Sequence, residues 1–316
     1  MLNLFQTALE LGLISSITVL ALYLSYSMLN VCDLSTDGAF TLGACVGAVV
    51  AIAGHPLLSI PAAMLAGVAS GFVTALLQTK MGIDSLLAGI VVNTGLYSIN
   101  IAVMGNSSLL NMNKTDTVFS GLKELLSGTP LAEQYKLIIA LLAVLIICTL
   151  LILLLRTRLG LAIRATGNNL AMVRSSSINT SVITIIGLCV SNAFTGLSGC
   201  LLAQYNKSVN IDIGTGMLTI ALASLLIGRM FFRKRGTAFG VLGAVLGACV
   251  FRVIYTLALR FNMPAYLLKL ISSVIVIAAI SGPYYQSKYA AECKRRLARQ
   301  SLLEPLAQES GEGRNV

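Results

Sequence analysis

Apolar residues occupy most of this chain in long runs, and short polar stretches separate the runs. A helix needs about 20 apolar residues to cross the hydrocarbon of a bilayer. Most of the runs approach that length, whereas the second and seventh are shorter and follow turn-rich polar stretches. The pattern therefore predicts an all-α, polytopic membrane protein with about nine transmembrane helices. The runs lie near 8–29, 38–54, 58–79, 85–104, 136–155, 181–204, 215–231, 237–258 and 264–282.

Composition supports a membrane protein. Of 316 residues, 56% are hydrophobic and 11% are charged, whereas a soluble domain has about 25% charged residues. The first run lacks a basic leader and a small-residue cleavage site, so we expect the first helix to be retained. The net charge is +10, but the cations gather at the ends of apolar runs. Membrane orientation explains this placement better than nucleic acid does, and we expect no nucleic-acid partner.

Positive charge also predicts the orientation in the membrane. The stretch 156–180, RTRLGLAIRATGNNLAMVRSSSINT, carries four arginines and no acid. Lys and Arg resist translocation, so we place this loop in the cytosol. Alternation then puts the N-terminus outside and the C-terminus inside. Residues 1–285 form the membrane domain, and 286–316 form a basic, partly disordered cytosolic tail that can lie against anionic lipid headgroups.

The sequence offers little for catalysis. Most of the seven cysteines fall inside apolar runs without a CxxC pair, and the one histidine, His55, precedes a proline in a turn. We therefore expect no metal site. No two acids pair as a dyad within a helix, and no phosphate-binding G-x-x-x-x-G-K-[ST] loop is present. We expect a non-enzyme, which as an energised transporter would need a separate motor.

Polar residues inside apolar runs are more informative, because their burial in lipid is costly. In the run 85–104 three of them recur on one helix face, and the run 181–204 repeats that spacing. They either hydrogen-bond between helices or line a pathway of neutral donors and acceptors. An Asp-Gly pair also opens the run 38–54, at a possible helix break. The candidate pathway residues are Asp37, Gly38, Asn93, Tyr97, Asn100, Asn192 and Thr195.

Two repeated patterns bear on packing and symmetry. Glycine pairs four residues apart, such as Gly43 with Gly47 and Gly67 with Gly71, let helix backbones approach closely. The sequence DLST at Asp33 also has an echo in DIGT at Asp212, each before a short apolar run. Our topology places these two segments on opposite sides, which suits two inverted halves, but chance is the better explanation for a match of four residues.

The cytosolic stretch 156–180 has its own local signals. Gly167-Asn168-Asn169 predicts a turn followed by an N-cap, and LAMVRSSS then forms a short helix. The sequence pattern of this stretch is R-x-x-L-G-x-A-I-R-A-T-G-x-N-x-x-A, ending in S-I-N. It resembles the cytosolic coupling segment of bacterial ABC importer permeases. Among these, the branched-chain amino acid and ribose permease superfamily is the closest branch. Residues 33–48, DLSTDGAFTLGACVGA, resemble the N-terminal signature of that family, with Asp33 where many members have Asn.

The resemblance implies a type II ABC importer-like fold in a bacterial inner membrane. It implies a homodimer, a separate ATPase that binds ATP and Mg²⁺, and an extracytoplasmic substrate-binding protein. The solute would be small and polar, with amino acids favoured over sugars or nucleosides. The alternative is a self-sufficient secondary transporter driven by H⁺ or Na⁺, with Asp37, Arg252 and Lys269 as its ionisable candidates. By the same resemblance, the ATPase-coupling residues are Arg164, Ala165, Thr166, Gly167, Asn168, Asn169, Ala171 and Met172.

Overall fold

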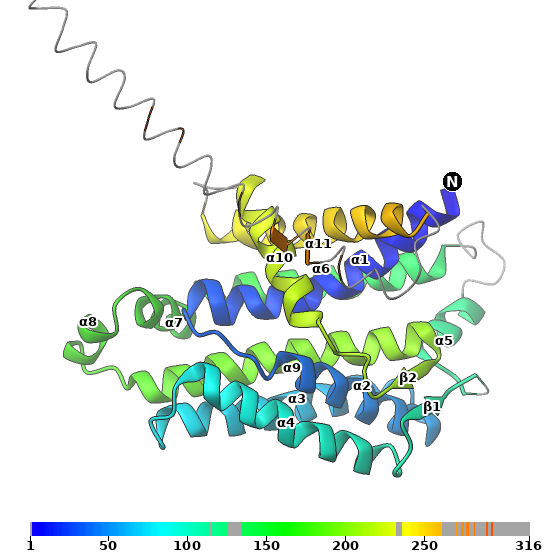
Figure 1. Cartoon of the computed structure of the whole chain (residues 1–316), viewed down its shortest axis with the longest axis horizontal. Coiled ribbons are helices and arrows are strands. Elements are labelled where there is room, and N and C mark those ends of the chain that lie inside the picture. Colours follow the sequence, from blue (N-terminus) through cyan, green and yellow to red (C-terminus); the bar gives the residue numbers. More distant parts are fainter. Residues whose placement is uncertain are drawn as a thin grey trace, which may run out of the picture.

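A computed structural model describes residues 2–113, 115–125, 134–231, 236–260 and isolated positions between 270 and 292. Most of the helices run along the long axis of the molecule, with α7 and α8 at one end and α5, β1 and β2 at the other (Figure 1). The elements are α1 (Leu2–Leu22), continued by the π-helix η1 (Tyr23–Met28), α2 (Thr36–Ile52), α3 (Ser59–Thr79), α4 (Ser85–Val103), β1 (Leu109–Asn111), α5 (Val118–Leu125), α6 (Tyr135–Arg156), α7 (Arg158–Asn168), α8 (Leu170–Ser175), α9 (Thr180–Asn206), β2 (Ser208–Asn210), α10 (Met217–Phe231) and α11 (Thr237–Arg260).

These helices agree with the predicted all-α, polytopic membrane protein. Six spans are long and apolar enough to cross a membrane, and α2 and α10 are shorter apolar helices. Together they account for eight of the nine predicted runs. The ninth, 264–282, lies mostly outside the described residues, as do the tail 286–316 and the domain boundary before it. The spans are Phe5–Met28, Ser59–Thr79, Ser85–Val103, Tyr135–Arg156, Thr180–Asn206 and Thr237–Ala258.

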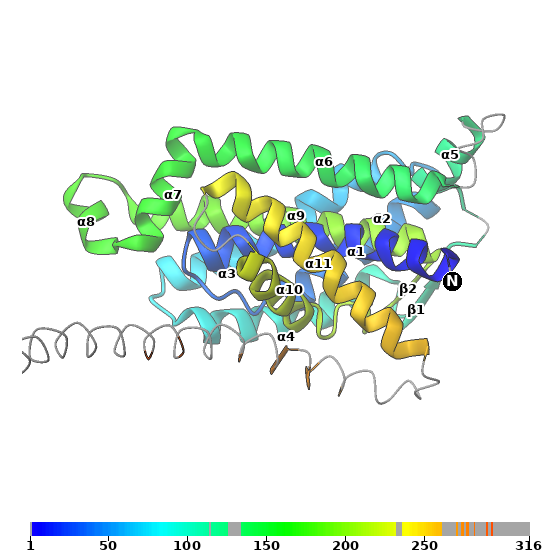
Figure 2. The same cartoon turned by 90° about the horizontal axis from the view of Figure 1, so that it is seen from above.

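Helix α9 lies at the centre of the bundle, against α1, α2 and α3 (Figures 1 and 2). Its contacts with α2 and α3 are made by backbone. A Cβ atom at Gly43 would collide with the backbone of Gly196, and one at Gly67 would collide with the carbonyl of Asn192. One at Gly71 would lie 2.6 Å from the carbonyl oxygen of Leu188. The predicted glycine pairs of α2 and α3 therefore pack within the chain's own bundle.

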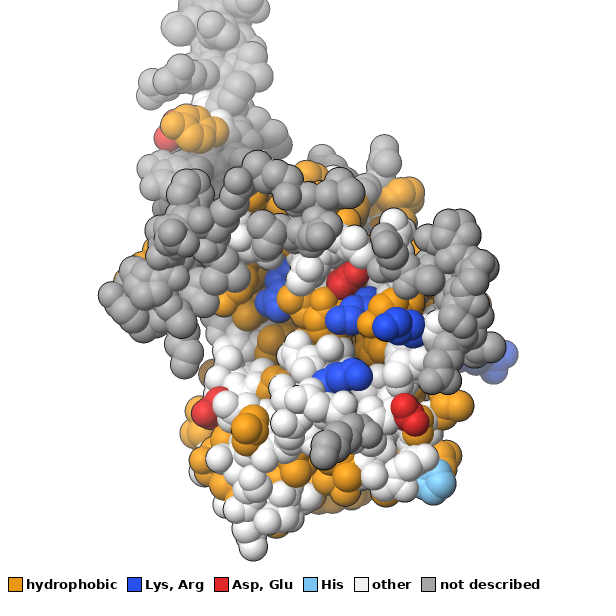
Figure 3. All heavy atoms as spheres, turned by 90° about the vertical axis from the view of Figure 1, so that its right-hand side faces the viewer, with side chains coloured by type: hydrophobic (Ala, Val, Ile, Leu, Met, Phe, Trp, Pro, Cys, Tyr) orange, Lys and Arg blue, Asp and Glu red, His pale blue; other side chains and the backbone are white. Residues whose placement is uncertain are grey.

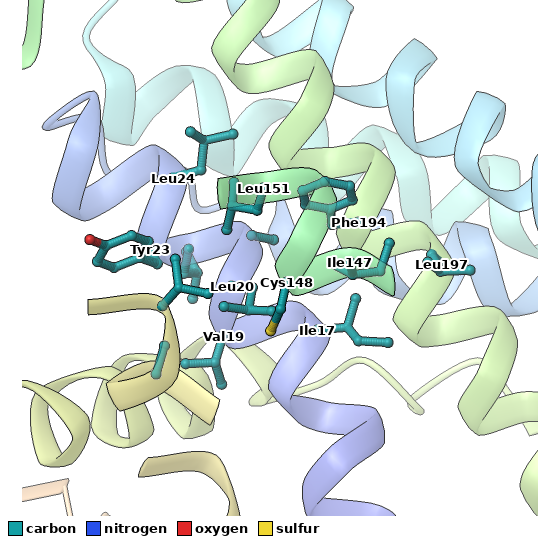
Figure 4. Packing of buried hydrophobic residues seen from close by; sticks show 14 of the residues in the cluster. Ile17, Val19, Leu20, Tyr23, Leu24, Ile147, Cys148, Leu151, Phe194 and Leu197 are labelled. Atoms are coloured by element: carbon teal, nitrogen blue, oxygen red, sulfur yellow. The ribbon is translucent and has the colours of Figure 1, made fainter. Parts of the chain in front are cut away.

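The main apolar core joins α1, α6 and α9. Ile17 and Leu20 of α1 lie near Ile147 of α6 and Phe194 of α9 (Figure 4), and all are buried. The opposite side of α6 is apolar and exposed, because it carries Leu141, Leu142, Leu145, Ile146, Leu150 and Leu153. Burial of one side and exposure of the other make α6 a lipid-facing helix at the edge of the bundle.

Two non-helical segments lead into the short helices. Residues 29–35 connect η1 to α2, and residues 211–216 connect β2 to α10. In the first segment the Asp33 side chain is 1% exposed. Its Oδ1 accepts hydrogen bonds from the backbone N–H and the hydroxyl of Ser35, at 2.8 and 2.6 Å. This turn fixes the point at which α2 begins. The second segment follows the antiparallel pair of β1 and β2.

Candidate functional site

The starts of α2 and α10 meet at a polar cavity. The cavity has a volume of about 290 Å³ and lies between these two starts and one face of α4. Its lining includes two carboxylates, two amides, three hydroxyl groups of threonine and one phenol, and no lysine or arginine among the residues that the structure describes. It is therefore rich in hydrogen-bond acceptors. The lining residues are Asp37, Gly38, Thr41, Asn93, Thr94, Tyr97, Asn100, Ile211, Asp212 and Thr215.

Asp37 joins the two short helices across this cavity. It lies in the first turn of α2, and its carboxylate accepts hydrogen bonds from the backbone N–H groups of Gly216 and Leu218, at 2.9 and 2.7 Å. A carboxylate at the N-terminus of a helix satisfies free amides and opposes the positive end of the helix dipole. Asp37 of α2 therefore caps α10. Gly216 has a φ of +85°, which a residue with a side chain rarely adopts, so the turn before α10 suits glycine.

The polar face of α4 meets α2 at Gly38. The Nδ2 of Asn100 donates a 3.3 Å hydrogen bond to the carbonyl oxygen of Gly38, and Asn100 is 1% exposed. A Cβ at Gly38 would lie 2.6 Å from Oδ1 of Asn93, so the absence of a side chain makes room for that amide. The Oδ1 of Asn100 is buried without a hydrogen-bond partner in the part of the chain that the structure describes. An unpaired buried acceptor beside a cavity suits a solute that carries a hydrogen-bond donor.

Five of the seven predicted pathway residues thus lie around one cavity: Asp37, Gly38, Asn93, Tyr97 and Asn100. The other two, Asn192 and Thr195, are not in its lining. Asn192 donates a 2.7 Å hydrogen bond to Asp33, and Thr195 bonds to the backbone of its own helix. Both are 1% exposed within the bundle, and Asn192 attaches the non-helical segment before α2 to α9.

Sequence reasoning did not assign Thr41, Thr94, Ile211, Asp212 or Thr215 to this site. The echo between DLST and DIGT was the available signal for Asp212 and Thr215, because it marked both segments as related helix starts. Their meeting is consistent with two inverted halves, whose discontinuous helices approach from opposite sides.

The second candidate region is the segment between α6 and α9. Thr157 caps α7 through a hydrogen bond from Gly160 N–H, and Asn169 caps α8 through a hydrogen bond from Met172 N–H, at 3.1 Å. The N-cap and the short helix therefore agree with the sequence prediction. The predicted turn at Gly167 is wrong, because Gly167 and Asn168 belong to helix α7. Gly167 is needed for close packing, since a Cβ there would collide with the carbonyl oxygen of Met28.

The predicted coupling residues differ in exposure. Thr166 is buried, and its hydroxyl bonds to the carbonyl oxygen of Ala162. Arg164, Ala165 and Gly167 are partly buried. The others project at the end of the molecule where Figure 1 shows α8. The exposed group consists of Asn168, Asn169, Ala171 and Met172, beside the exposed apolar Leu170.

Comparison with known proteins identifies the chain. Residues 4–280 match the profile of the family described as the branched-chain amino acid transport system permease component. The chain belongs to this family. The match confirms the resemblance to ABC importer permeases that the two sequence signatures indicate. No solved structure matches the chain.

Relatives of this permease differ in what their names say they carry. The tyrosine transport system permease protein of Clostridioides difficile (strain R20291) is 34% identical over 271 residues, which are 85% of this chain and 88% of that protein. The ribose import permease protein RbsC of Escherichia coli (strain K12) is 26% identical over 253 residues, 78% of this chain and 75% of that one. The autoinducer 2 import system permease protein LsrC of Yersinia enterocolitica (serotype O:8 / biotype 1B) is 24% identical over 247 residues, 75% and 65% of the two chains.

Proposed function

We propose that this permease moves a small solute with an amino group, most simply an amino acid, inward through the cavity at the starts of α2 and α10. The chemical groups that line the cavity are the main support for this proposal. Asp37 and Asp212 contribute carboxylates, Asn100 contributes an unpaired buried oxygen, and the described lining residues include no cation. An ammonium group has three donors and no acceptor, so it complements such a surface. The tyrosine-named relative supports the same class of solute.

The pathway is completed by a second copy of the chain. In a single chain, α4 exposes Thr94 and Tyr97 at the cavity, and Tyr97 is 52% exposed. Polar groups facing lipid are costly, so this face suits either a water-filled path or another protein surface. Two copies that face one another across α4 would enclose the cavities between them. In such a homodimer, the polar face of α4 would face the enclosed pathway and the second copy, and not lipid.

The energy comes from a partner ATPase, which would hold ATP and Mg²⁺. Three exposed residues at the start of α8 form a small apolar tip that fits a groove on such a partner: Leu170, Ala171 and Met172. The tip is connected to the cavity through Gly167, which packs against Met28 at the end of η1 and against Leu29, the first residue of the segment leading to α2. An extracytoplasmic binding protein would deliver the solute at the opposite end, and the tail 286–316 stays inside the cell in this arrangement.

A secondary transporter fits the cavity less well. Such a protein needs an embedded group that can take up a proton or coordinate an ion. Asp37 already accepts two backbone hydrogen bonds, and the Arg252 guanidinium lies 5.5 Å from the ring centre of Tyr255. Lys269 lies outside the described residues. The engagement of Asp37 and Arg252 favours transport driven by a partner.

Reconstitution tests this function. The permease, its ATPase and its binding protein are incorporated into vesicles, and uptake of radiolabelled tyrosine, leucine and ribose is followed with ATP, with a non-hydrolysable analogue and with a proton gradient alone. We expect ATP-dependent uptake of an amino acid and none of ribose. Uptake driven by the gradient without ATP would refute the importer mechanism. ATP-driven uptake of ribose alone would refute the assignment of the solute while retaining the mechanism.

A further inference from the structure

A second and larger cavity lies at the opposite end from α8. Its volume is about 610 Å³, and it is bounded by α5, the first residues of α6 and the end of α9. In contrast to the first cavity, its lining includes three lysines and no acid among the residues described there. Figure 3 looks onto this end and shows Lys and Arg side chains gathered near its middle. The lining residues are Asn113, Thr117, Phe119, Ser120, Lys123, Tyr135, Lys136, Gln204, Tyr205, Asn206 and Lys207.

Aromatic rings hold two of these lysines in place. The ammonium of Lys136 lies 4.4 Å from the ring centre of Tyr205, and that of Lys123 lies 5.9 Å from the ring centre of Tyr135. The ring of Tyr205 meets that of buried Phe119 edge to face, with centres 5.9 Å apart. Cation–π contact positions an ammonium and leaves its donors available for an anion.

The floor of the cavity is fixed by buried hydrogen bonds. Gln204 is 1% exposed and bridges two elements: its Oε1 accepts from Val118 N–H of α5 at 2.9 Å, and its Nε2 donates to the hydroxyl of Ser59 at 2.6 Å. The nearby acid Glu10 is 4% exposed, and its carboxylate accepts from the hydroxyl of Tyr205 and from the amide of Gln6. The acid that contacts Tyr205 is thus engaged by other donors, and no acid among the described lining residues competes with an external anion for the lysines.

The position of the cavity indicates the kind of anion. Tyr135 and Lys136 are the first two residues of α6, whose outer side is the exposed apolar surface described above. Its 22 residues extend for about 33 Å, close to the thickness of the bilayer hydrocarbon. The start of α6 therefore lies where the hydrocarbon ends, which is the level at which Tyr and Lys meet lipid headgroups. Positive-inside orientation places this end in the outer leaflet.

We propose that this second cavity binds the phosphate of an anionic lipid headgroup through its three lysines, Lys123, Lys136 and Lys207. Its continuity with the lipid-facing side of α6 favours a membrane lipid over a protein partner. The lipid would join α5 and the end of α9 to the surrounding bilayer. This site is separate from the solute cavity, and the proposal does not depend on the identity of the solute.

Native mass spectrometry tests the proposal. The full chain is purified from nanodiscs that contain either phosphatidylglycerol or phosphatidylcholine, and the lipid retained on the protein is measured. We expect wild type to retain phosphatidylglycerol selectively, and the double variant Lys136→Gln, Lys207→Gln to lose most of that retention. Lys136→Arg with Lys207→Arg keeps the charge and should keep the lipid. Lys80→Gln, which changes a lysine at the far end of α3, is the matched surface control.

Several results would overturn the assignment. Equal retention of phosphatidylglycerol by wild type and the double Gln variant, at equal thermal stability, would exclude a headgroup site at these lysines. Release of the lipid by millimolar inorganic phosphate would identify a site for a free anion. Unchanged lipid retention together with lost capture of the extracytoplasmic binding protein would show that the cavity takes an acidic side chain of that partner. Because the readout is retained lipid, failure here leaves the transport proposal intact.

Discussion

Asn192 donates a 2.7 Å hydrogen bond from its Nδ2 to the Oδ2 of Asp33, across 159 residues of sequence. Both side chains are 1% exposed. Since the other oxygen of Asp33 binds Ser35, one carboxylate attaches the segment before α2 to the central helix α9. The start of α2, and with it the solute cavity, therefore depends on a contact between distant parts of the chain.

Replacing Asp33 should distinguish charge from hydrogen bonding. Asp33→Ala leaves three donors without their acceptor, and we expect a loss of stability of about 1–3 kcal/mol for each buried group left unsatisfied. Asp33→Asn should cost much less, because the Oδ1 of Asn192 has no partner and can accept from the new amide after that side chain turns. Thermal denaturation in detergent compares the two. Equal destabilisation by both variants would contradict this account of the contact.

A side chain at Gly38 should displace Asn93 into the solute cavity. The new Cβ of Gly38→Ala would lie 2.6 Å from Oδ1 of Asn93, which is the end of a flexible side chain. We expect normal folding and a several-fold loss of uptake, with a complete block for Gly38→Leu. Gly95→Ala is the control on α4, because nothing lies within 4 Å of its Cβ position. Normal transport by well-expressed Gly38→Leu would show that the space serves packing alone.

Removal of the Asp37 carboxylate should weaken the start of α10. Asp37→Ala leaves the N–H groups of Gly216 and Leu218 without their acceptor, at a cost of about 1–2 kcal/mol, as for other helix caps. Uptake should fall further than stability, because the same carboxylate lines the cavity. Melting temperature and uptake are measured on the same preparation. Uptake that falls only in proportion to the amount of folded protein would assign Asp37 a structural role alone.

The tip of α8 should be sensitive to charge if an ATPase binds it. Ala171 is exposed in the isolated chain, and Ala171→Glu would place an unpaired carboxylate in the proposed interface, at roughly 2–5 kcal/mol if fully buried there. The variant should insert normally, bind its ATPase weakly and lose coupled transport. Pull-down and uptake at matched expression measure both effects.

Arg158→Gln is the charge control for that experiment, because Arg158 lies at the first residue of α7, away from the tip. It should leave binding nearly unchanged. Gly167→Val belongs to a different class, since its side chain would collide with the carbonyl of Met28 and reduce folding itself. Normal coupling by Ala171→Glu together with lost coupling by Arg158→Gln would indicate an electrostatic anchor.

Orientation can be tested with single cysteines in a background from which the seven native cysteines are removed. Lys123→Cys on α5 should react with an impermeant reagent in intact cells, and Ser176→Cys after α8 should react only after lysis. The positive-inside rule supplies the reason, because the arginine-rich segment resists translocation. The opposite labelling pattern would reverse the topology and would move the lipid site to the inner leaflet.

Local patterns predicted most of the helices and part of the solute cavity. Apolar runs gave the spans, and the spacing of Asn93, Tyr97 and Asn100 gave the polar face of α4. The sequence did not predict the partners of those residues, because Asp37 and Gly216 meet across 179 positions. It also misassigned Gly167 to a turn, since a glycine needed for close packing and one needed for positive φ look the same in sequence.

One acidic residue was accessible to sequence reasoning and was missed. Glu10 stands inside the first apolar run, where an acid is costly, and such a residue is by default a candidate for function or pairing. Its acceptance of the Tyr205 hydroxyl shows the pairing. Asn192 shows a question that the sequence pattern alone could not decide. Its spacing in the apolar run was compatible with a pathway, and only its hydrogen bond to Asp33 shows that it attaches the segment before α2 to α9.

The backbone contacts of α2, α3 and α9 limit how this molecule can change shape. Where two helices meet through glycine, no layer of side chains separates them that could rearrange into a second packing. These three helices therefore behave as one rigid unit, and their amide protons should be the slowest in the chain to exchange with solvent. Opening of the solute cavity then falls to what borders that unit: the edge helix α4 and the segment before α10. If these three helices stay fixed, transport by this permease requires displacement of only a minority of its residues.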